Sequence, residues 1–158
     1  MEWAEAVTAH GNCGEGLIKA LGEASEKYTS SRPRGVFIIG ELSAIGADEA
    51  DRNKSRSVAI QFSKNLPNVV AGIVAQQRIP DFEHCILAVP GINLSQTSDR
   101  LGQQFASPQN AIIERGADVV IVGRGIYHAE NPIESAKEYQ RVSWEAYLTS
   151  LLQNSRGF

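Results

Sequence analysis

The stretch VVIVGRGIYHAENP, residues 119–132, leads from an apolar run into Gly-Arg-Gly at 123–125 and then into a helix start. Successive apolar residues predict a strand that is covered on both faces, as in a parallel sheet. Asn131 before Pro132, with Glu134 three residues after the asparagine, predicts the first turn of a helix. The stretch is therefore typical of a strand and a helix joined by a loop that carries an arginine between two glycines.

Short apolar runs alternate with amphipathic stretches through the rest of the chain. They predict strands at residues 7–10 (beginning near Glu5), 35–42, 69–75, 85–89 and 118–123. Helices are expected at residues 15–24, from a cap at Asp51 to the break at 65–67, from Ser107-Pro108 to Gly116, and from Asn131 onward. The expected core faces hold Leu17, Leu21 and Ala24 in the first helix, Val58 and Phe62 in the second, and Ile133, Ala136, Trp144, Tyr147, Leu148 and Leu151 in the last.

This alternation predicts an α/β fold of parallel strands, either a doubly wound sheet or a (β/α) barrel. In both, ligands bind beyond the carboxyl ends of the strands. The residues at those ends are His10, Glu41, Ser43, Gln76, Gln77, Pro90, Gly91, Gly123 and Arg124.

Composition is that of a folded globular chain, with 158 residues, 42% hydrophobic and 21% charged, and we expect one domain over residues 1–158. A net charge of −3 provides no general field for polyanions, so nucleic acid is not expected as a partner and any phosphate must be held by a few placed donors.

Cys13 and Cys85 are too few for a disulfide framework and too isolated for a zinc site, so we expect reduced thiols and no metal. No apolar run approaches the roughly 20 residues that a membrane span needs, and the first residues lack the features of a signal peptide. These observations favour a cytoplasmic protein without a membrane partner.

The Gly-Arg-Gly loop predicts a binding site for an anion. Gly123 and Gly125 allow the backbone to approach a ligand closely, and the Arg124 fork can hold two phosphate oxygens. The alternative is a tight turn with a solvated arginine.

Other strand-end residues are less specific. The 14-residue polar segment 92–105 ends in LGQQF, where a glutamine could close over the same phosphate as a lid. Ser43 could bind a heterocycle edge or cap a turn. His10 is either a structural histidine or a general base without a visible nucleophile.

Five motifs in order resemble orotidine 5′-phosphate decarboxylase of the eukaryotic type, which often forms the second half of UMP synthase. They are ELSAIG (41–46), VPGI (89–92), LGQQF (101–105), ADVVIVGRGIY (117–127) and YQRVSWEAYL (139–148). The resemblance implies a (β/α)₈ TIM barrel of the ribulose-phosphate-binding type, of which this chain would form strands 4–8. It also implies a homodimeric lyase that converts orotidine 5′-phosphate to UMP without a cofactor, in pyrimidine biosynthesis.

By the same resemblance, the substrate-binding residues would be Ser43 at the pyrimidine, Pro90 against the base, and Gln103, Gly123 and Arg124 at the phosphate. Gly91, Gly125 and His10 are weaker candidates. Phe105 stands where the family usually has a tyrosine, so one hydroxyl to the phosphate would be missing.

A larger departure concerns catalysis. The family pattern Asp-x-Lys-x-x-Asp is absent from this sequence, and the run that begins at Asp51 has the wrong spacing. We therefore expect no catalytic residue in this chain and no turnover by the chain alone. It would carry the phosphate and pyrimidine half of the site, and it would form a homodimer or associate with the missing amino-terminal part.

Two alternatives remain open at this point. One is a non-catalytic UMP-binding or regulatory module that dimerises through the barrel surface. The other is a different phosphate-binding barrel enzyme, which would share the Gly-Arg-Gly strand end but not LGQQF or WEAYL.

Overall fold

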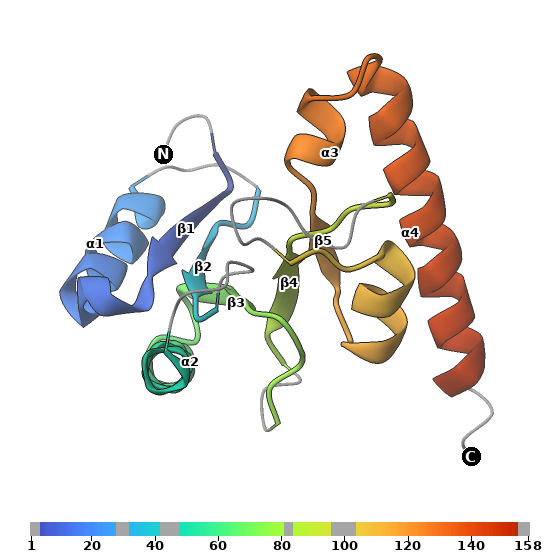
Figure 1. Ribbon diagram of the computed structural model, residues 1–158. Helices are drawn as coiled ribbons and strands as arrows, with labels where there is room; N and C mark the ends of the chain where they lie inside the picture. The colour runs from blue at the N-terminus through green and yellow to red at the C-terminus, as the bar shows by residue number, and fades with distance from the viewer. Residues whose placement is uncertain (1–3, 28–31, 42–47, 81–83, 96–103, 155–158) are drawn as a thin grey trace. The chain divides into compact units, whose positions relative to one another are not determined.

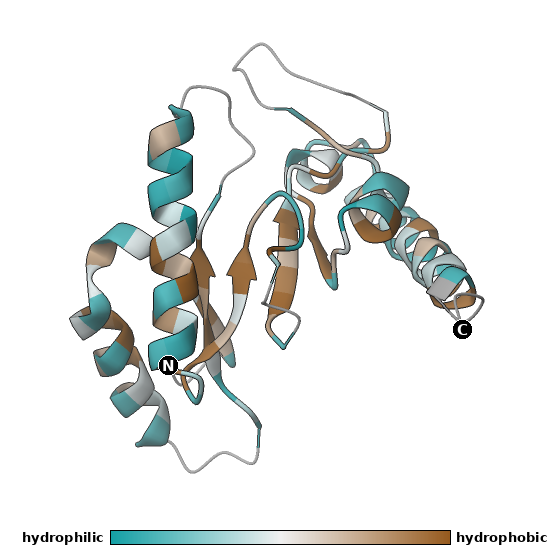
Figure 2. Ribbon diagram, turned by 90° about the horizontal axis from the view of Figure 1, so that it is seen from below, coloured by the Kyte–Doolittle hydropathy of each residue, from teal (hydrophilic) through white to brown (hydrophobic). Residues whose placement is uncertain are grey.

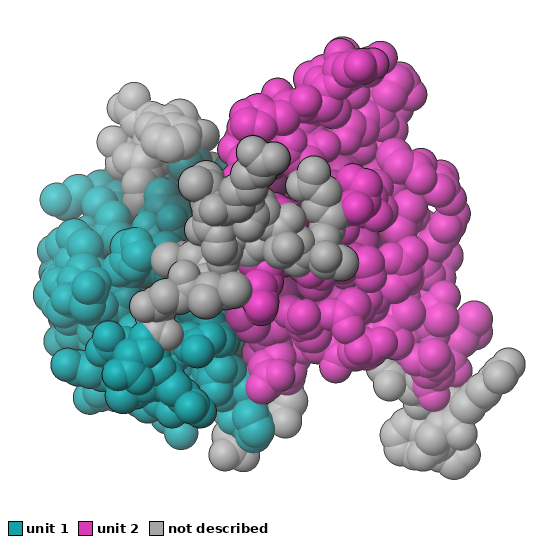
Figure 3. Space-filling model, viewed as in Figure 1, with its two compact units in different colours: residues 1–42, 47–75, 79–86 teal, residues 43–46, 76–78, 87–158 magenta. Residues whose placement is uncertain are grey.

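The computed structural model describes residues 4–27, 32–41, 48–80, 84–95 and 104–154. Two compact units make up the chain (Figure 3). Unit 1 comprises residues 1–42, 47–75 and 79–86, and unit 2 comprises residues 43–46, 76–78 and 87–158. This division does not test the expectation of one domain over residues 1–158, which stays a prediction.

Unit 1 is built on three parallel strands, β1 (Ala6–His10), β2 (Gly35–Ile39) and β3 (Val70–Val74), with β2 in the middle (Figure 1). A short 3-10 turn, η1 (Gly11–Cys13), follows β1. Helices α1 (Glu15–Glu26) and α2 (Glu49–Asn65) connect successive strands. The strands are coloured as hydrophobic over most of their length in Figure 2, which agrees with the buried central residues Val36 and Ile38. The predicted parallel α/β alternation is confirmed.

Helix α1 turns a different face to the core from the expected one. Ile18 is completely buried and Gly22 is buried beside it, whereas Leu17 is 47% exposed. A Cβ atom at position 22 would lie 2.6 Å from Val69 Cγ2, so the glycine lets this side of the helix approach the sheet closely. The prediction that Leu17 belongs to the core face is therefore wrong.

Helix α2 begins earlier than the sequence suggested. Its N-cap is Asp48, whose side chain accepts a hydrogen bond of 2.9 Å from the Ala50 amide, and Asp51 lies in the first turn. An acidic residue there still favours the helix, because its charge complements the amino-terminal end of the helix dipole. The expected core residue Phe62 is buried, and the helix ends at Asn65 as predicted.

Unit 2 contains two parallel strands, β4 (Ile86–Pro90) and β5 (Val119–Ile121), that pair with each other. The first residue of β4 belongs to unit 1. Between them lies a short π-helical segment, η2 (Asn110–Glu114), and after β5 come α3 (Arg124–Tyr127) and the long helix α4 (Pro132–Asn154). In Figure 1, α4 runs past both α3 and the η2 segment.

The local signals at the helix ends of unit 2 are confirmed. The Ser107 hydroxyl accepts a hydrogen bond of 3.1 Å from the Asn110 amide, and Gly116 ends the segment at a φ of 73°. At the start of α4, the Asn131 side chain accepts a hydrogen bond of 3.3 Å from the Glu134 amide.

The face of α4 that packs against unit 2 is not the predicted one. Tyr139, Val142 and Ala146 are buried, at the spacing of one helix face. The residues expected in the core include five that are exposed, Ile133, Trp144, Tyr147, Leu148 and Leu151. Helix α4 thus has two apolar stripes, of which only the one containing Tyr139 is covered in unit 2.

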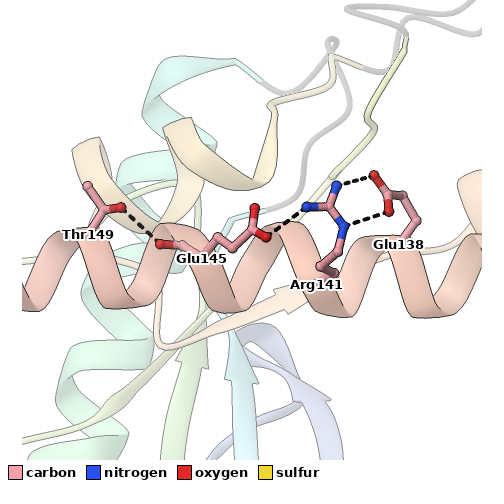
Figure 4. A network of polar contacts seen from close by, with 4 residues as sticks. All are labelled: Glu138, Arg141, Glu145 and Thr149. Atoms are coloured by element: carbon pink, nitrogen blue, oxygen red, sulfur yellow. Dashed lines mark hydrogen bonds and ion pairs between the residues drawn. The ribbon is translucent and has the colours of Figure 1, made fainter.

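A third face of α4 is charged. Arg141 binds the Glu138 carboxylate through two nitrogens, at 2.6 and 2.9 Å, and the Glu145 carboxylate at 2.7 Å (Figure 4). The Thr149 hydroxyl donates to the Glu145 carbonyl at 2.9 Å. These i,i+3 and i,i+4 contacts mark the solvent side of the helix.

The amino-terminal ends of β4 and β5 are joined by Asp118. Its Oδ2 atom accepts hydrogen bonds from the Leu87 amide at 2.7 Å and from Arg78 at 2.8 Å. Arg78 also donates to the Gly116 carbonyl at 2.6 Å. Among the described residues, no helix is both long and apolar enough to cross a membrane.

Candidate functional site

The loops after β4 and β5 lie next to each other in unit 2. The parallel register pairs Pro90 with Ile121, so Gly91 follows one strand where Gly123 and Arg124 follow its neighbour. Carboxyl ends of adjacent parallel strands are the usual place for a ligand site in α/β proteins. The structure thus brings together four of the residues that the sequence singled out.

The loop after β4 begins at Gly91. Its φ of 77° lies in the left-handed region that favours glycine, and its carbonyl accepts a hydrogen bond of 2.9 Å from the Ala106 amide. The Asn93 amide donates to the Ala106 carbonyl at 3.0 Å. These two hydrogen bonds hold the end of the LGQQF motif beside the loop that follows β4.

Phe105 and Arg124 meet at the same edge. The guanidinium carbon of Arg124 lies 5.8 Å from the centroid of the Phe105 ring, and both side chains are half-buried. A cation over an aromatic face is stabilised by about 0.5–1 kcal/mol at sites of this kind. Phe105 therefore provides a surface against which the arginine is oriented.

Gly125 is required for packing inside the unit. A Cβ atom there would collide with the Tyr139 hydroxyl oxygen, and the Gly125 carbonyl accepts a hydrogen bond of 2.8 Å from the Ser135 hydroxyl. By contrast, a Cβ atom on Gly123 would make only ordinary contact with Tyr127, at 3.6 Å. The Gly-Arg-Gly motif predicted a close approach of the backbone to a ligand at both glycines, and the structure distinguishes the two.

Tyr139 is the site residue that sequence reasoning missed. It is 5% exposed, touches Gly125, and its hydroxyl accepts a hydrogen bond of 3.1 Å from the Leu94 amide. One side chain of α4 thereby fixes both the loop after β4 and the loop after β5. The available signal was the spacing of Tyr139, Val142 and Ala146, which marks the buried face of the helix.

Other predicted residues lie elsewhere. Ser43 and Gln103 fall outside the described residues. His10 is exposed at the carboxyl end of β1, in unit 1. Gln76, a strand-end candidate, accepts a hydrogen bond of 3.0 Å from Arg115 in unit 2.

Glu41 follows β2 in unit 1, where its carboxylate forms an ion pair. Its side chain is 9% exposed and binds Arg56 of α2 at 2.7 Å. The Gly40 and Glu41 amides both donate to the Val74 carbonyl at 3.0 Å, which closes the end of β2 against β3. Glu41 is thus a structural partner of α2 within its unit.

The described residues contain no group of three or more histidine, cysteine or acidic side chains arranged to hold a metal ion. Cys13 is exposed and Cys85 is buried, and the two do not form a disulfide.

Comparisons with known proteins point in one direction. The family described as Orotidine 5′-phosphate decarboxylase / HUMPS matches residues 1–139. A protein of Passalora fulva named Orotidine 5′-phosphate decarboxylase is 37% identical over 158 residues, which cover 93% of this chain and 56% of the relative. The Uridine 5′-monophosphate synthase of Bos taurus is 36% identical, over 94% of this chain and 30% of the relative.

A solved structure has the same fold. The orotidine 5′-monophosphate decarboxylase from Sulfolobus solfataricus matches with a TM-score of 0.64 and 21% identity, over 91% of this chain and 63% of that chain. The present chain therefore spans about half the length of the curated decarboxylases it matches, and less than a third of the bovine synthase.

Proposed function

Because this chain belongs to the Orotidine 5′-phosphate decarboxylase / HUMPS family, we propose that it binds the phosphate and pyrimidine of orotidine 5′-phosphate or UMP. The membership confirms the resemblance that the sequence motifs indicated, and the fold is that of part of a TIM barrel. The observation that carries the proposal is the position of Arg124, half-buried at the carboxyl edge of β5 and oriented by Phe105.

The proposed ligand contacts follow from the chemistry of these groups. The Arg124 fork matches two oxygens of a phosphate monoester, and the amides at Gly123 and Arg124 begin the short helix α3. Pro90 offers an apolar surface for a base at the end of the neighbouring strand. Gln103 at the phosphate and Ser43 at the pyrimidine complete the proposed set.

The absence of a tyrosine at position 105 changes how the phosphate is held. A tyrosine hydroxyl could donate a hydrogen bond to the phosphate, whereas Phe105 acts through the Arg124 guanidinium. A lost hydrogen bond to a charged group is worth about 1.5–3 kcal/mol if nothing replaces it. We therefore propose a functional but weaker phosphate site.

The reaction of the whole protein would be decarboxylation of orotidine 5′-phosphate to UMP, without a cofactor. In that step the bond to the carboxylate breaks, CO₂ leaves, and the electron pair stays on the ring carbon until a lysine ammonium donates a proton to it. Nearby carboxylates would repel the departing carboxylate and so favour its loss as CO₂. The Asp-x-Lys-x-x-Asp pattern that supplies these groups is absent from the 158 residues, so this chain requires another segment for turnover.

Cytoplasmic location and homodimer formation belong to the same proposal. Both follow from the family to which the chain belongs.

Calorimetry with UMP and with uridine tests the binding proposal. The two ligands differ only in the phosphate, so we expect UMP to bind at least tenfold more tightly, which is about 1.4 kcal/mol. Equal affinities would contradict a site organised around Arg124.

A second candidate function is a non-catalytic UMP-binding or regulatory module, favoured by the missing catalytic pattern. Absorbance of orotidine 5′-phosphate distinguishes the two. With a polypeptide that supplies the missing lysine and aspartates, the first candidate predicts decarboxylation, and the second predicts binding without turnover.

A further inference from the structure

Helix α4 reaches both loops of the candidate site through one buried side chain, Tyr139. We infer that Tyr139 is a positioning residue, whose hydroxyl holds Arg124 in the orientation that favours a ligand with a phosphate group. The effect on ligand affinity rests on the proposed function. The contacts that orient Arg124 do not depend on it.

The first connection runs from Tyr139 to the backbone beside Arg124. The Tyr139 hydroxyl lies so close to Gly125, the next residue along the chain, that a Cβ atom there would collide with it. The Gly125 carbonyl accepts a hydrogen bond of 2.8 Å from the hydroxyl of Ser135, which lies one turn before Tyr139 on α4. Two neighbouring side chains of α4 therefore hold the first residues of α3 in place.

The second connection runs through the loop after β4. The Tyr139 hydroxyl accepts a hydrogen bond of 3.1 Å from the Leu94 amide. Asn93, which precedes Leu94 and is 8% exposed, donates its amide to the Ala106 carbonyl at 3.0 Å. Its side-chain oxygen accepts the Ser95 amide at 2.9 Å, which closes the turn around Leu94. The hydroxyl thus fixes the turn to which residue 106 is hydrogen-bonded.

Phe105 completes this second connection. It precedes Ala106, whose backbone forms a parallel bridge with Ile92, and its ring lies 5.8 Å from the guanidinium carbon of Arg124. Both connections from Tyr139 therefore end at Arg124, one at its backbone and the other at its charged group. Loss of the single hydroxyl should disturb both.

The expected consequence is selective for a phosphate. A guanidinium that is already oriented loses less side-chain entropy when it binds two phosphate oxygens. Uridine has no phosphate, so its affinity gains nothing from the orientation of Arg124. A residue that only stabilised the fold would change the affinities for UMP and uridine together, so a loss confined to UMP is the sign of a positioning role.

Tyr139→Phe keeps the ring and removes the hydroxyl. Calorimetry should show UMP affinity lower by about two- to tenfold, the factor that one hydrogen bond is worth, with uridine affinity unchanged. Tyr147→Phe is the matched control, because it is the same change on the same helix at a residue that is 42% exposed, and it should alter neither affinity. An equal loss for UMP and uridine in Tyr139→Phe, or no loss for either, overturns the inference.

NMR of the chain without ligand separates this inference from the proposed function. The Phe105 ring should shift the side-chain resonances of Arg124, and Phe105→Ala gives the reference change. Tyr139→Phe should move the same resonances in the same direction, and the Leu94 amide should exchange faster than in the parent.

Two results in the absence of ligand contradict the role of Tyr139. One is a set of unchanged Arg124 resonances in a Tyr139→Phe variant that is folded by circular dichroism. The other needs no variant: a Leu94 amide of the parent chain that exchanges at the rate of an unprotected amide. If the parent binds UMP no more tightly than uridine, the proposed function fails, and these two measurements still decide whether Tyr139 orients Arg124.

Discussion

The Arg124 guanidinium lies over the Phe105 ring, with its central carbon 5.8 Å from the ring centroid. The two residues come from different loops, and the Gly91 turn holds Phe105 in place through the Ala106 amide. An arginine oriented in this way loses less side-chain entropy on binding an anion than a freely solvated one. The contact therefore links the packing of unit 2 to the proposed phosphate affinity.

Phe105→Ala should weaken UMP binding by about two- to fivefold, because the cation–π contact is worth about 0.5–1 kcal/mol. Phe105→Tyr keeps the ring and adds a hydroxyl, so it should strengthen UMP binding by about tenfold or more if that hydroxyl reaches the phosphate. Calorimetry measures both variants. If removal of the ring leaves the UMP affinity unchanged, Phe105 does not orient Arg124.

Gly125→Ala should destabilise unit 2 by about 1–3 kcal/mol, because the new methyl group would collide with the Tyr139 hydroxyl. Gly123→Ala is the matched control, since its Cβ would make only ordinary contact with Tyr127. Urea unfolding of the two variants gives the comparison. Similar free energies of unfolding for both would contradict the packing role assigned to Gly125.

Asp118→Ala should destabilise unit 2 by about 1–3 kcal/mol, because it removes the acceptor shared by the Leu87 amide and Arg78. Asp51→Ala, on the exposed first turn of α2, should cost less than about 1 kcal/mol. Thermal unfolding of the two variants provides the measurement. A larger effect at Asp51 than at Asp118 would refute the prediction.

The charged face of α4 should contribute stability only at higher pH. Two hydrogen bonds from Arg141 hold the pKa of the Glu138 carboxyl below its ordinary value of 4.5. A depressed pKa means that this contribution is present above pH 4.5 and is lost as the pH falls through the folded-state value. Arg141→Gln should therefore lower the unfolding temperature at pH 7 more than at pH 3. A difference that does not change with pH would speak against the contact.

Local features of this fold could be predicted from the sequence. The caps at Ser107 and Asn131 and the break after Asn65 depend on a few neighbouring residues, and the structure confirms all three. Several acidic residues lie at the start of α2, and the sequence pattern does not distinguish between them as the N-cap. The sequence predicted Asp51, whereas Asp48 is the N-cap in the structure.

Features that depend on distant residues could not be predicted. The buried face of α4 is set by what Tyr139 touches, namely Gly125 and the Leu94 amide, and neither contact is visible in periodicity. The same helix carries a second apolar stripe around Trp144, and hydrophobicity alone favoured that stripe as the buried face. In the candidate site, the strand ends follow from the order of the apolar runs, so the sequence identified Pro90, Gly91, Gly123 and Arg124. The contact of Phe105 with Arg124 and the role of Tyr139 depend on how distant segments fold together.

The proposed function depends on Arg124, which would hold the phosphate of a pyrimidine nucleotide. Titration of UMP into the Arg124→Ala variant measures this contact, with Arg52→Ala, a change at an exposed arginine of α2, as the matched control. Arg124→Ala should lose at least about tenfold in affinity, the equivalent of one charge-assisted hydrogen bond, while Arg52→Ala should bind like the parent. Unchanged UMP affinity in a folded Arg124→Ala variant would rule out the proposed role of Arg124.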